Sequence, residues 1–309
     1  MRAVYLDEGK ITLREIDALS DEGIRVHVRS TGICGSDLHM LKMNLPATCV
    51  AGHEIAGMLD DGRAVAIEPV VPCDECVYCK MGCYNLCSQV KVLGITRNGG
   101  MADEVIVPER CLVYLPSTVE VKDACLVEPL AVAVHGMRLA GVKGTQRIAV
   151  IGGGAIGLCA VAVVETSGAE VGLAARYDHQ MVIGSHFGAR EIEGQYDLVV
   201  ECAGTQKAIQ KAINLCRSGG KLLVLGTHWE GVTFPQIAIM MKEITVVNSY
   251  MYADSEEGRD FDMAAALLSR KPEIAGSLIT HRFPLADAEQ AFSVAHDRKR
   301  GTIKVIMEP

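Results

Sequence analysis

The sequence lacks any run of 18 or more apolar residues, and residues 1–8 do not form the apolar core of a signal peptide. We therefore expect no membrane span and no export signal, and we expect the protein to reside in the cytoplasm. A long basic run is also absent, and the net charge is −8. This balance argues against nucleic acid or an anionic membrane as the main partner. The sequence shows neither internal repeats nor a low-complexity tract.

What the sequence does contain is twelve cysteines among 309 residues. In a chain without an export signal, cysteines are typically metal ligands or buried thiols rather than disulfides. Hydrophobic residues make up 49% and charged residues 22%, as in ordinary soluble globular proteins. The length predicts two domains, each with a core of its own.

The pattern of apolar runs changes twice along the chain. Residues 1 to about 125 contain short strand candidates, such as Ile24–Arg29 with its alternating polarity. From about Leu130, apolar strands alternate with helical segments, which is the rhythm of a doubly wound parallel sheet. Short strands return after Pro272. We predict an α/β protein with a β-rich domain, residues 1–130 and 273–309, and a Rossmann domain, residues 131–272.

The stretch around Gly152 predicts a dinucleotide-binding turn. The apolar run Ile148–Ile151 reads as a buried strand, glycines follow with G-x-G-x-x-G spacing, and Leu158–Val164 reads as a helix. Gly152 permits the tight turn, Gly154 lets the backbone approach a pyrophosphate, and Gly157 allows close packing of helix on strand. The motif alone is weak, but the strand before it and the helix after it are the context that it requires.

Four cysteines follow the spacing C-x2-C-x2-C-x7-C, and they are Cys73, Cys76, Cys79 and Cys87. Four thiolates on a compact loop can form a closed tetrahedral zinc site with no position open for chemistry. We interpret Cys83, inside the same loop, as a spare. An iron–sulfur cluster uses the same four ligands, and four reduced cysteines in an ordinary loop are the plainest alternative. The distance of the last cysteine from the first three favours zinc.

Three other stretches bring reactive side chains together. Residues 34–39 supply a thiol, a hydroxyl, a carboxylate and an imidazole, and His53 lies beside Glu54. Glu128 interrupts an apolar run, where a carboxylate is costly to bury unless it is paired or binds a metal. Taken singly, Cys34 is more typical of a small buried hydrophobic residue, and His53 of a hydrogen-bonded core histidine.

Together these motifs make the chain similar to the zinc-containing medium-chain alcohol and polyol dehydrogenases, closest to the sorbitol and threonine dehydrogenase branch. The resemblance runs essentially from end to end. It rests on G-I-C-G-S-D at 32–37, G-H-E at 52–54, the cysteine lobe at 73–87, E-P-L-A at 128–131 and G-G-G-A-I-G at 152–157, and E-C-A-G-T at 201–205 and G-G-K-L-L-V-L-G at 219–226 also fit. It implies a GroES-like catalytic domain and hydride transfer between a secondary alcohol or polyol and a nicotinamide cofactor.

The resemblance also implies two zinc ions per chain. The catalytic zinc would be bound by Cys34, His53 and Glu54, with Glu128 contacting the metal or its bound water, and it needs an open coordination position. The structural zinc would be bound by the four-cysteine lobe, Cys73, Cys76, Cys79 and Cys87.

A proton relay is implied as well. Asp37 resembles the carboxylate that orients the ligand histidine in this family. Ser36 corresponds to the hydroxyl that hydrogen-bonds the substrate alcohol, and His39 to the outer end of the relay. For His39, a plain surface histidine is the alternative.

The expected cofactor is NADP(H). NAD-binding members of the family end the second Rossmann strand with an acid that holds the ribose hydroxyls, but here Ala175 and Arg176 stand at that point. A guanidinium binds a 2′-phosphate through charge-assisted hydrogen bonds, and Tyr177 can stack on the adenine. The alternative is that Arg176 is a solvated loop charge and that Asp178 serves NAD. The cofactor-binding residues expected from the motifs are Gly152, Gly154, Ala155, Ile156, Gly157, Ala175, Arg176, Tyr177 and Gly226.

Two rival classes share the Rossmann domain. A zinc-independent quinone or enone reductase and a non-catalytic NADPH-binding sensor have no need for Cys34, His53 or the cysteine lobe.

The motifs do not identify the substrate. The short segment 58–63 replaces a longer hairpin of the family, so the local geometry there is a departure. Relatives form dimers and tetramers, and Ile244–Tyr250 is a candidate intersubunit strand.

Overall fold

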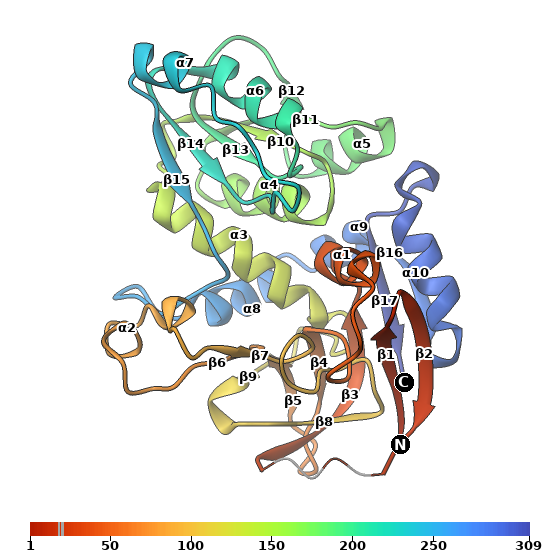
Figure 1. Cartoon of the computed structure of the whole chain (residues 1–309). Helices are drawn as coiled ribbons and strands as arrows, with labels where there is room; N and C mark the ends of the chain where they lie inside the picture. The colour runs from red at the N-terminus through yellow and green to blue at the C-terminus, as the bar shows by residue number, and fades with distance from the viewer. Residues whose placement is uncertain (18, 20–21) are drawn as a thin grey trace. The chain divides into compact units, whose positions relative to one another are not determined.

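The computed structural model describes residues 1–17, 19 and 22–309 and divides into two compact units. Unit 1 comprises Met1–Glu128 and Ala253–Pro309, and unit 2 comprises Pro129–Tyr252. Unit 1 is rich in β-strands, whereas unit 2 alternates strands and helices around a parallel sheet (Figure 1). The prediction of an α/β protein with one β-rich and one doubly wound part is confirmed.

The main sheet of unit 1 has seven strands in the order β16-β17-β3-β4-β5-β9, with β8 paired to β3. These strands are β3 (Ile24–Gly32), β4 (Glu54–Met58), β5 (Ala64–Ile67), β8 (Glu104–Val107), β9 (Leu112–Tyr114), β16 (Ile279–Pro284) and β17 (Lys304–Glu308). Two small sheets pair β1 (Arg2–Asp7) with β2 (Lys10–Glu15) and β6 (Val70–Val71) with β7 (Lys91–Val92). The predicted strand at Ile24–Arg29 buries Val26 and Val28 in the core, as its alternation requires.

Short helices fill the connections of unit 1. The α-helices are α1 (Gly35–Met43), α2 (Val77–Lys80), α8 (Asp260–Arg270), α9 (Glu273–Leu278) and α10 (Ala288–His296). The 3-10 turns are η1 (Tyr84–Leu86), η2 (Glu109–Cys111), η3 (Ala124–Leu126), η4 (Leu285–Asp287) and η5 (Arg298–Arg300). The short strands expected after Pro272 are β16, which begins directly after α9 ends at Leu278, and β17.

Unit 2 has a six-stranded parallel sheet in the order β12-β11-β10-β13-β14-β15. The strands are β10 (Arg147–Ile151), β11 (Glu170–Ala174), β12 (Arg190–Glu191), β13 (Tyr196–Glu201), β14 (Cys216–Val224) and β15 (Thr245–Asn248). The helices are α3 (Val127–Ala140), whose first two residues belong to unit 1, α4 (Ala155–Thr166), α5 (Asp178–His186), α6 (Gln206–Leu215) and α7 (Gln236–Met241). The order reverses between β10 and β13, and such a point is where open α/β sheets bind dinucleotides.

The boundary between the units differs from the expected one at its second crossing. Residues 253–272, which we expected in the Rossmann domain, lie in unit 1. Arg259 forms an ion pair with the fully buried Glu68, and its guanidinium donates to the carbonyl of Arg110 at 2.8 Å. The hydroxyls of Thr118 and Ser269 are 2.6 Å apart. These polar contacts hold α8 on the β-rich unit.

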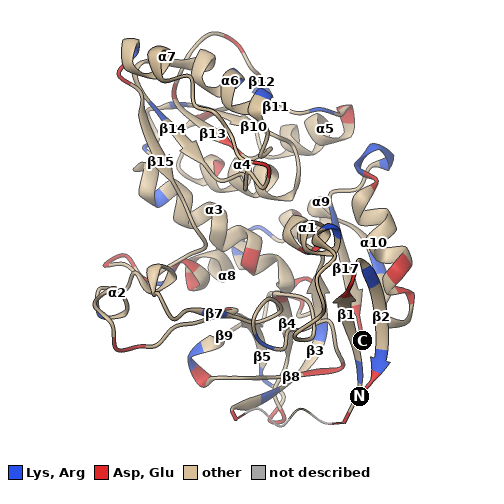
Figure 2. Ribbon diagram, viewed as in Figure 1, with Lys and Arg blue, Asp and Glu red and all other residues tan. Residues whose placement is uncertain are grey.

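Charged residues of both signs are interspersed along the elements of each unit (Figure 2). No helix in the described part of the chain is both long and apolar enough to cross a membrane.

Candidate active site and metal sites

Strand pairing brings Cys34, His53 and Glu54 together in unit 1. In the antiparallel pair of β3 and β4, Gly32 lies opposite Glu54, so the residues that follow β3 meet the residues that begin β4. Cys34 precedes the first turn of α1. One ligand atom from each of the three side chains lies within 4.8 Å of the others. The three residues named from separate motifs are therefore one cluster.

The surroundings of His53 fit a metal ligand. Its Nδ1 lies 3.5 Å from Oδ1 of Asp37, and the other carboxylate oxygen of Asp37 accepts the backbone N–H of Cys34 at 2.8 Å. Ser36 Oγ lies 3.4 Å from Nε2 of the imidazole. The carboxylate of Asp37 therefore lies at the Nδ1 edge of the ring, while Nε2 faces Ser36, and a carboxylate in this position can set the tautomer of a ligand histidine.

The electrostatics of the cluster favour a cation. Burial alone would lower the pKa of His53, but the carboxylate of Asp37 and the thiol of Cys34 outweigh it, so the pKa is raised well above its ordinary value. A site that favours positive charge on a buried imidazole, and that offers sulfur, nitrogen and oxygen donors, suits Zn²⁺. Buried Oδ1 of Asp37 and Nδ1 of His53 have no conventional hydrogen-bond partner within the described residues.

Glu54 has a partner that the motifs did not reveal. Lys304, the first residue of β17, donates to both carboxylate oxygens at 2.6 and 2.8 Å and to the carbonyl of Ile33 at 3.1 Å. The side chain of Glu54 is 0% exposed and that of Lys304 is 3% exposed. Burial alone would lower the pKa of Lys304, but the charge of Glu54 outweighs it and raises the pKa above its ordinary value.

Two further predicted residues, Glu128 and His39, lie in the same unit. Glu128 is buried in the first turn of α3 and lies outside the cluster formed by Cys34, His53 and Glu54 in the described residues. His39 is half-buried on α1, three residues after Ser36. Residues three apart on a helix share a face. The spacing therefore allows the two α1 side chains to act in sequence.

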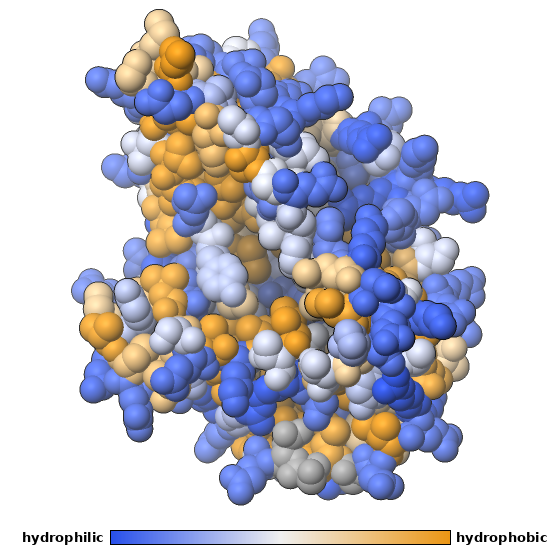
Figure 3. Space-filling model, viewed as in Figure 1, coloured by the Kyte–Doolittle hydropathy of each residue, from blue (hydrophilic) through white to orange (hydrophobic). Residues whose placement is uncertain are grey.

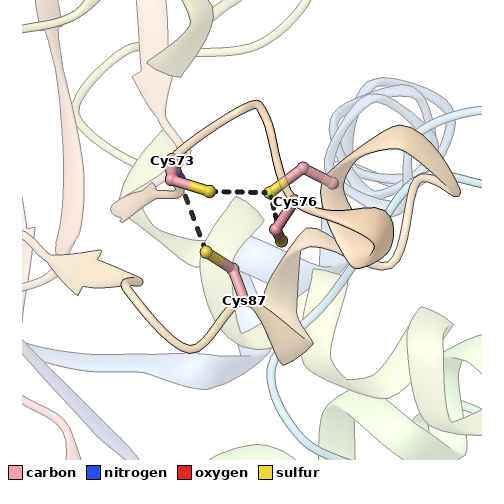
Figure 4. A group of neighbouring side chains, drawn as sticks. Cys73, Cys76 and Cys87 are labelled. Atoms are coloured by element: carbon pink, nitrogen blue, oxygen red, sulfur yellow. Dashed lines mark hydrogen bonds between the residues drawn. The ribbon is translucent and has the colours of Figure 1, made fainter.

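The cysteine lobe forms the second cluster. The sulfurs of Cys73, Cys76, Cys79 and Cys87 all lie within 4.8 Å of one another. Figure 4 shows the labelled side chains of Cys73, Cys76 and Cys87 turned toward a common centre. The Sγ–Sγ distances are 3.4 Å from Cys76 to Cys79 and 3.9 Å from Cys73 to Cys79. A tetrahedral zinc with Zn–S bonds near 2.3 Å needs sulfurs about 3.8 Å apart.

The backbone of the lobe also stabilises thiolate sulfur. Amide groups of Glu75 and Cys76, with a further contribution from Cys87, lower the pKa of Cys73 to about 7. The backbone N–H groups of Cys73 and Gln89 donate to the sulfur of Cys87 at 3.5 and 3.4 Å. Because metal-binding cysteines must be deprotonated, such donors suit a thiolate metal site. Cys83, predicted to be a spare, donates to the carbonyl of Met81 instead.

The glycine-rich turn of unit 2 has the predicted strand–turn–helix context. β10 ends at Ile151, Gly152 has φ +109°, and α4 begins after Gly154, with Ala155 and Ile156 in its first turn. A Cβ on Gly157 would lie 1.8 Å from the carbonyl oxygen of Gly152, so only glycine fits there.

The end of β11 carries no carboxylate. The strand ends at Ala174, and Ala175, Arg176 and Tyr177 lead into α5, whose first residue is Asp178. The buried side chain of Gln180 accepts the backbone N–H groups of Arg176 and Tyr177 at 3.1 and 3.3 Å. The guanidinium of Arg176 lies 5.5 Å from the ring centroid of Tyr177.

Comparison with known proteins supplies the family. Residues 20–117 match the alcohol dehydrogenase GroES-like domain, and residues 189–270 match the zinc-binding dehydrogenase family. The sorbitol dehydrogenase of Halalkalibacterium halodurans is 30% identical over 93% of this chain and 91% of its own length. The chain belongs to the zinc-containing alcohol and polyol dehydrogenases. It is an oxidoreductase, and the predicted GroES-like and Rossmann folds are confirmed.

Two solved structures extend the comparison to the fold. Galactitol-1-phosphate dehydrogenase from Escherichia coli is 26% identical with a TM-score of 0.90, and the match covers 100% of both chains. A Sinorhizobium meliloti protein bound to NADP is 27% identical with a TM-score of 0.86, and the match covers 100% of this chain and 99% of that one.

Proposed function

We propose that this zinc-dependent oxidoreductase oxidises a secondary hydroxyl of a polyol, or reduces the matching ketone, with NADP(H). The observation that carries the proposal is the cluster of Cys34, His53 and Glu54, with the hydroxyl of Ser36 3.4 Å from the imidazole of His53. Relatives named for sorbitol and galactitol 1-phosphate support a polyol as the substrate class. Glu54 and Glu128 support the polyol branch over simple primary alcohols.

Cys34, His53 and Glu54 would hold the catalytic zinc, and Glu128 would contact the metal or its water. Zinc supplies, when bound, the Lewis acidity that lowers the pKa of an alcohol, and the nicotinamide supplies the hydride acceptor. Asp37 orients the imidazole of His53. In the absence of a metal, the ammonium group of Lys304 balances the negative charge of Glu54.

Proton removal falls to side chains of α1. Ser36 lies beside Nε2 of His53, the ring nitrogen that Asp37 leaves available, so its hydroxyl would accept the proton of a substrate alcohol and pass its own outward. His39, on the same face of the helix, is the next acceptor.

A second zinc would be held by Cys73, Cys76, Cys79 and Cys87, whose sulfur spacing fits a closed tetrahedron. Because all four positions are taken by thiolates, this metal would have no part in the chemistry. It would contribute folding free energy to the lobe instead.

The preference for NADP(H) over NAD(H) rests on the end of β11. Asp178 stands in the first turn of α5, where a carboxylate suits the helix N-terminus, rather than at the end of the strand. In the described part of the chain no carboxylate pairs with the exposed side chain of Arg176, and Tyr177 supports its guanidinium from one side. A 2′-phosphate would therefore meet a free cation.

We also propose a homodimer or homotetramer, built on an apolar face of unit 2. Among the described residues, β15 is the last strand of its sheet and leaves one edge unpaired. Beside it, α7 exposes Ile237, Met240 and Met241, with 68%, 59% and 77% of their surface accessible. Figure 3 shows hydrophobic residues gathered at this side of the unit. An open strand edge beside an apolar face is typical of a contact with a second copy.

Metal analysis with a substrate panel tests the central proposal. We expect about two zinc ions per chain and turnover with one or more members of a panel of sugars, polyols, diols and hydroxy-amino acids. Cys34→Ser should abolish turnover and leave the fold largely intact, because one side chain of the cluster carries little of the core. Cys49→Ser, a cysteine outside both clusters, is the matched control and should keep parental turnover. Parental turnover in Cys34→Ser, or a zinc-free active protein, would favour a zinc-independent reductase.

Arg176→Ala tests the cofactor preference separately. One charge-assisted phosphate contact should be worth about 1.5–3 kcal/mol, or roughly 10- to 150-fold in the ratio of kcat/KM for NADP over NAD. The variant should lose most of that ratio and keep its use of NAD. Equal or better use of NAD by the parent enzyme would refute the preference.

A further inference from the structure

Glu201 occupies the place in unit 2 where the strand order reverses. It is the last residue of β13, it lies opposite Ile151 of β10 and it lies opposite Val224 of β14. The two halves of a doubly wound sheet each bind one mononucleotide, and the dinucleotide crosses between them at this reversal. Since the glycine-rich turn follows β10, the turns after β13 and β14 belong to the nicotinamide half.

A single residue ties these two turns together. Oε1 of Glu201 accepts the backbone N–H groups of Ala203 and Gly204 at 2.7 and 2.8 Å. Its backbone carbonyl accepts the N–H groups of Leu225 and Gly226 at 2.9 Å each. A Cβ on Gly226 would lie 2.5 Å from Oε2 of Glu201, so the glycine leaves room for the carboxylate.

The second carboxylate oxygen faces an imidazole. Oε2 of Glu201 lies 3.5 Å from Nε2 of His228, the side chains are 0% and 9% exposed, and neither atom has a conventional hydrogen-bond partner within the described residues. Burial raises the pKa of Glu201 above its ordinary value, and it outweighs the opposite effect of the N–H groups of Ala203 and Gly204 and of the charge of His228. At 3.5 Å the two groups lie at the outer limit of a hydrogen bond, and in buried surroundings their attraction is stronger than it would be in water.

We propose that Glu201 and His228 are positioning residues for the nicotinamide half of the cofactor. The pairing of Oε2 with Nε2 holds the turn 225–228 that follows β14 against the end of β13, and this turn receives the nicotinamide mononucleotide. The inference rests on the proposed function, because it presumes a dinucleotide in this unit. The two side chains act through the turn, which explains why both are almost wholly buried.

His228→Leu is the decisive variant, measured on the zinc-loaded full chain by fluorescence titration with NADPH and NADH. Removing the imidazole should weaken the Kd for both cofactors about 10-fold, the value of one modest hydrogen bond. The Kd for 5′-AMP, which lacks the nicotinamide half, should not change. His228→Gln keeps a side-chain N–H donor and should restore the cofactor Kd to within about 3-fold. His186→Gln, an exposed histidine of the same unit, is the matched control.

Glu201→Gln completes a double-mutant cycle, because the amide retains an oxygen that can accept from Ala203 and Gly204. If the two side chains act as a pair, the loss of cofactor affinity in the double variant should be smaller than the product of the single losses. A melting temperature measured without cofactor separates misfolding from a change in binding.

An unchanged NADPH and NADH affinity in a folded His228→Leu protein would overturn the inference, as would an equal loss of 5′-AMP affinity. Additive losses in the cycle would overturn the pairing of Glu201 with His228. A parent protein that binds 5′-AMP, NADPH and NADH with equal Kd would show that the nicotinamide half makes no contact here. A parent that binds none of them would refute the proposed function itself.

Discussion

Lys304→Met removes the ammonium group that pairs with Glu54 and keeps a side chain of similar length. Lys304 makes three hydrogen bonds, at 2.6 and 2.8 Å to Glu54 and at 3.1 Å to the carbonyl of Ile33. Both partners are buried, so the variant leaves a carboxylate in the interior without its counter-charge. Breaking such a pair from one side typically costs about 3–5 kcal/mol.

For a unit of this size, each kcal/mol corresponds to about 2–4 °C, so the melting temperature of the metal-free protein should fall by roughly 6–20 °C. Thermal unfolding followed by circular dichroism measures the change. Lys299→Met, an exposed lysine on η5, is the matched control and should stay within about 0.5 kcal/mol of the parent. Adding Glu54→Gln to Lys304→Met should recover much of the loss, because no charge then remains unpaired.

The same variant measured with bound zinc tests whether Glu54 is a metal ligand. If Glu54 is a ligand, the metal takes over the role of the ammonium group, and the destabilisation by Lys304→Met should shrink when zinc is bound. The pH dependence follows from the raised pKa of Lys304. Its contribution is fully present below the unfolded value of 10.5 and is lost only as the pH rises through the folded value. A metal-free Lys304→Met protein as stable as the parent at pH 7 would refute this reasoning.

Three further variants probe other parts of the molecule. Cys76→Ser should lose about one zinc per chain and melt at a lower temperature, because a structural zinc contributes folding free energy; parental stability would remove the structural role. Glu128→Gln should lower kcat by roughly 10- to 1000-fold, and a rate unchanged across pH would return Glu128 to a helix-start role. Asp197 accepts the backbone N–H of Arg147 and the guanidinium of Arg217, which lower its pKa below 3.8. Asp197→Asn should therefore unfold more easily in urea at pH 7, and the gap should close as the pH falls below about 4; a gap that persists in acid would contradict the assignment.

Local motifs made most of the fold and the two clusters of candidate metal ligands predictable. The cysteine lobe lies within 15 residues of chain. The glycine-rich turn lies directly between the apolar run of its strand and the apolar run of its helix. Cys34 follows β3 and His53 precedes β4, so one antiparallel pairing of these two strands brings their motifs together. In each case a short stretch of sequence carried its own geometry.

The partners contributed by distant segments were not predictable. Lys304 lies 250 residues from Glu54, and a lysine in a strand usually reads as a solvent-facing charge. The pair of Glu201 and His228 joins the last residue of β13 to the turn that follows β14. The second domain boundary fell at 252 rather than 272 because of Arg259, whose ion pair with Glu68 has no local sequence signal.

The division of unit 1 into two chain segments has a consequence for biosynthesis. Unit 2 is continuous, so all of its strands are synthesised before residues 253–309 of unit 1. The main sheet of unit 1 closes only when β17 docks beside β3, and the ammonium that neutralises Glu54 arrives with that same strand. A nascent chain stopped just before residue 304 would carry every proposed zinc ligand and yet hold one of them as an uncompensated charge. The proposed zinc site therefore gains the partner of Glu54 only after residue 304 has been synthesised.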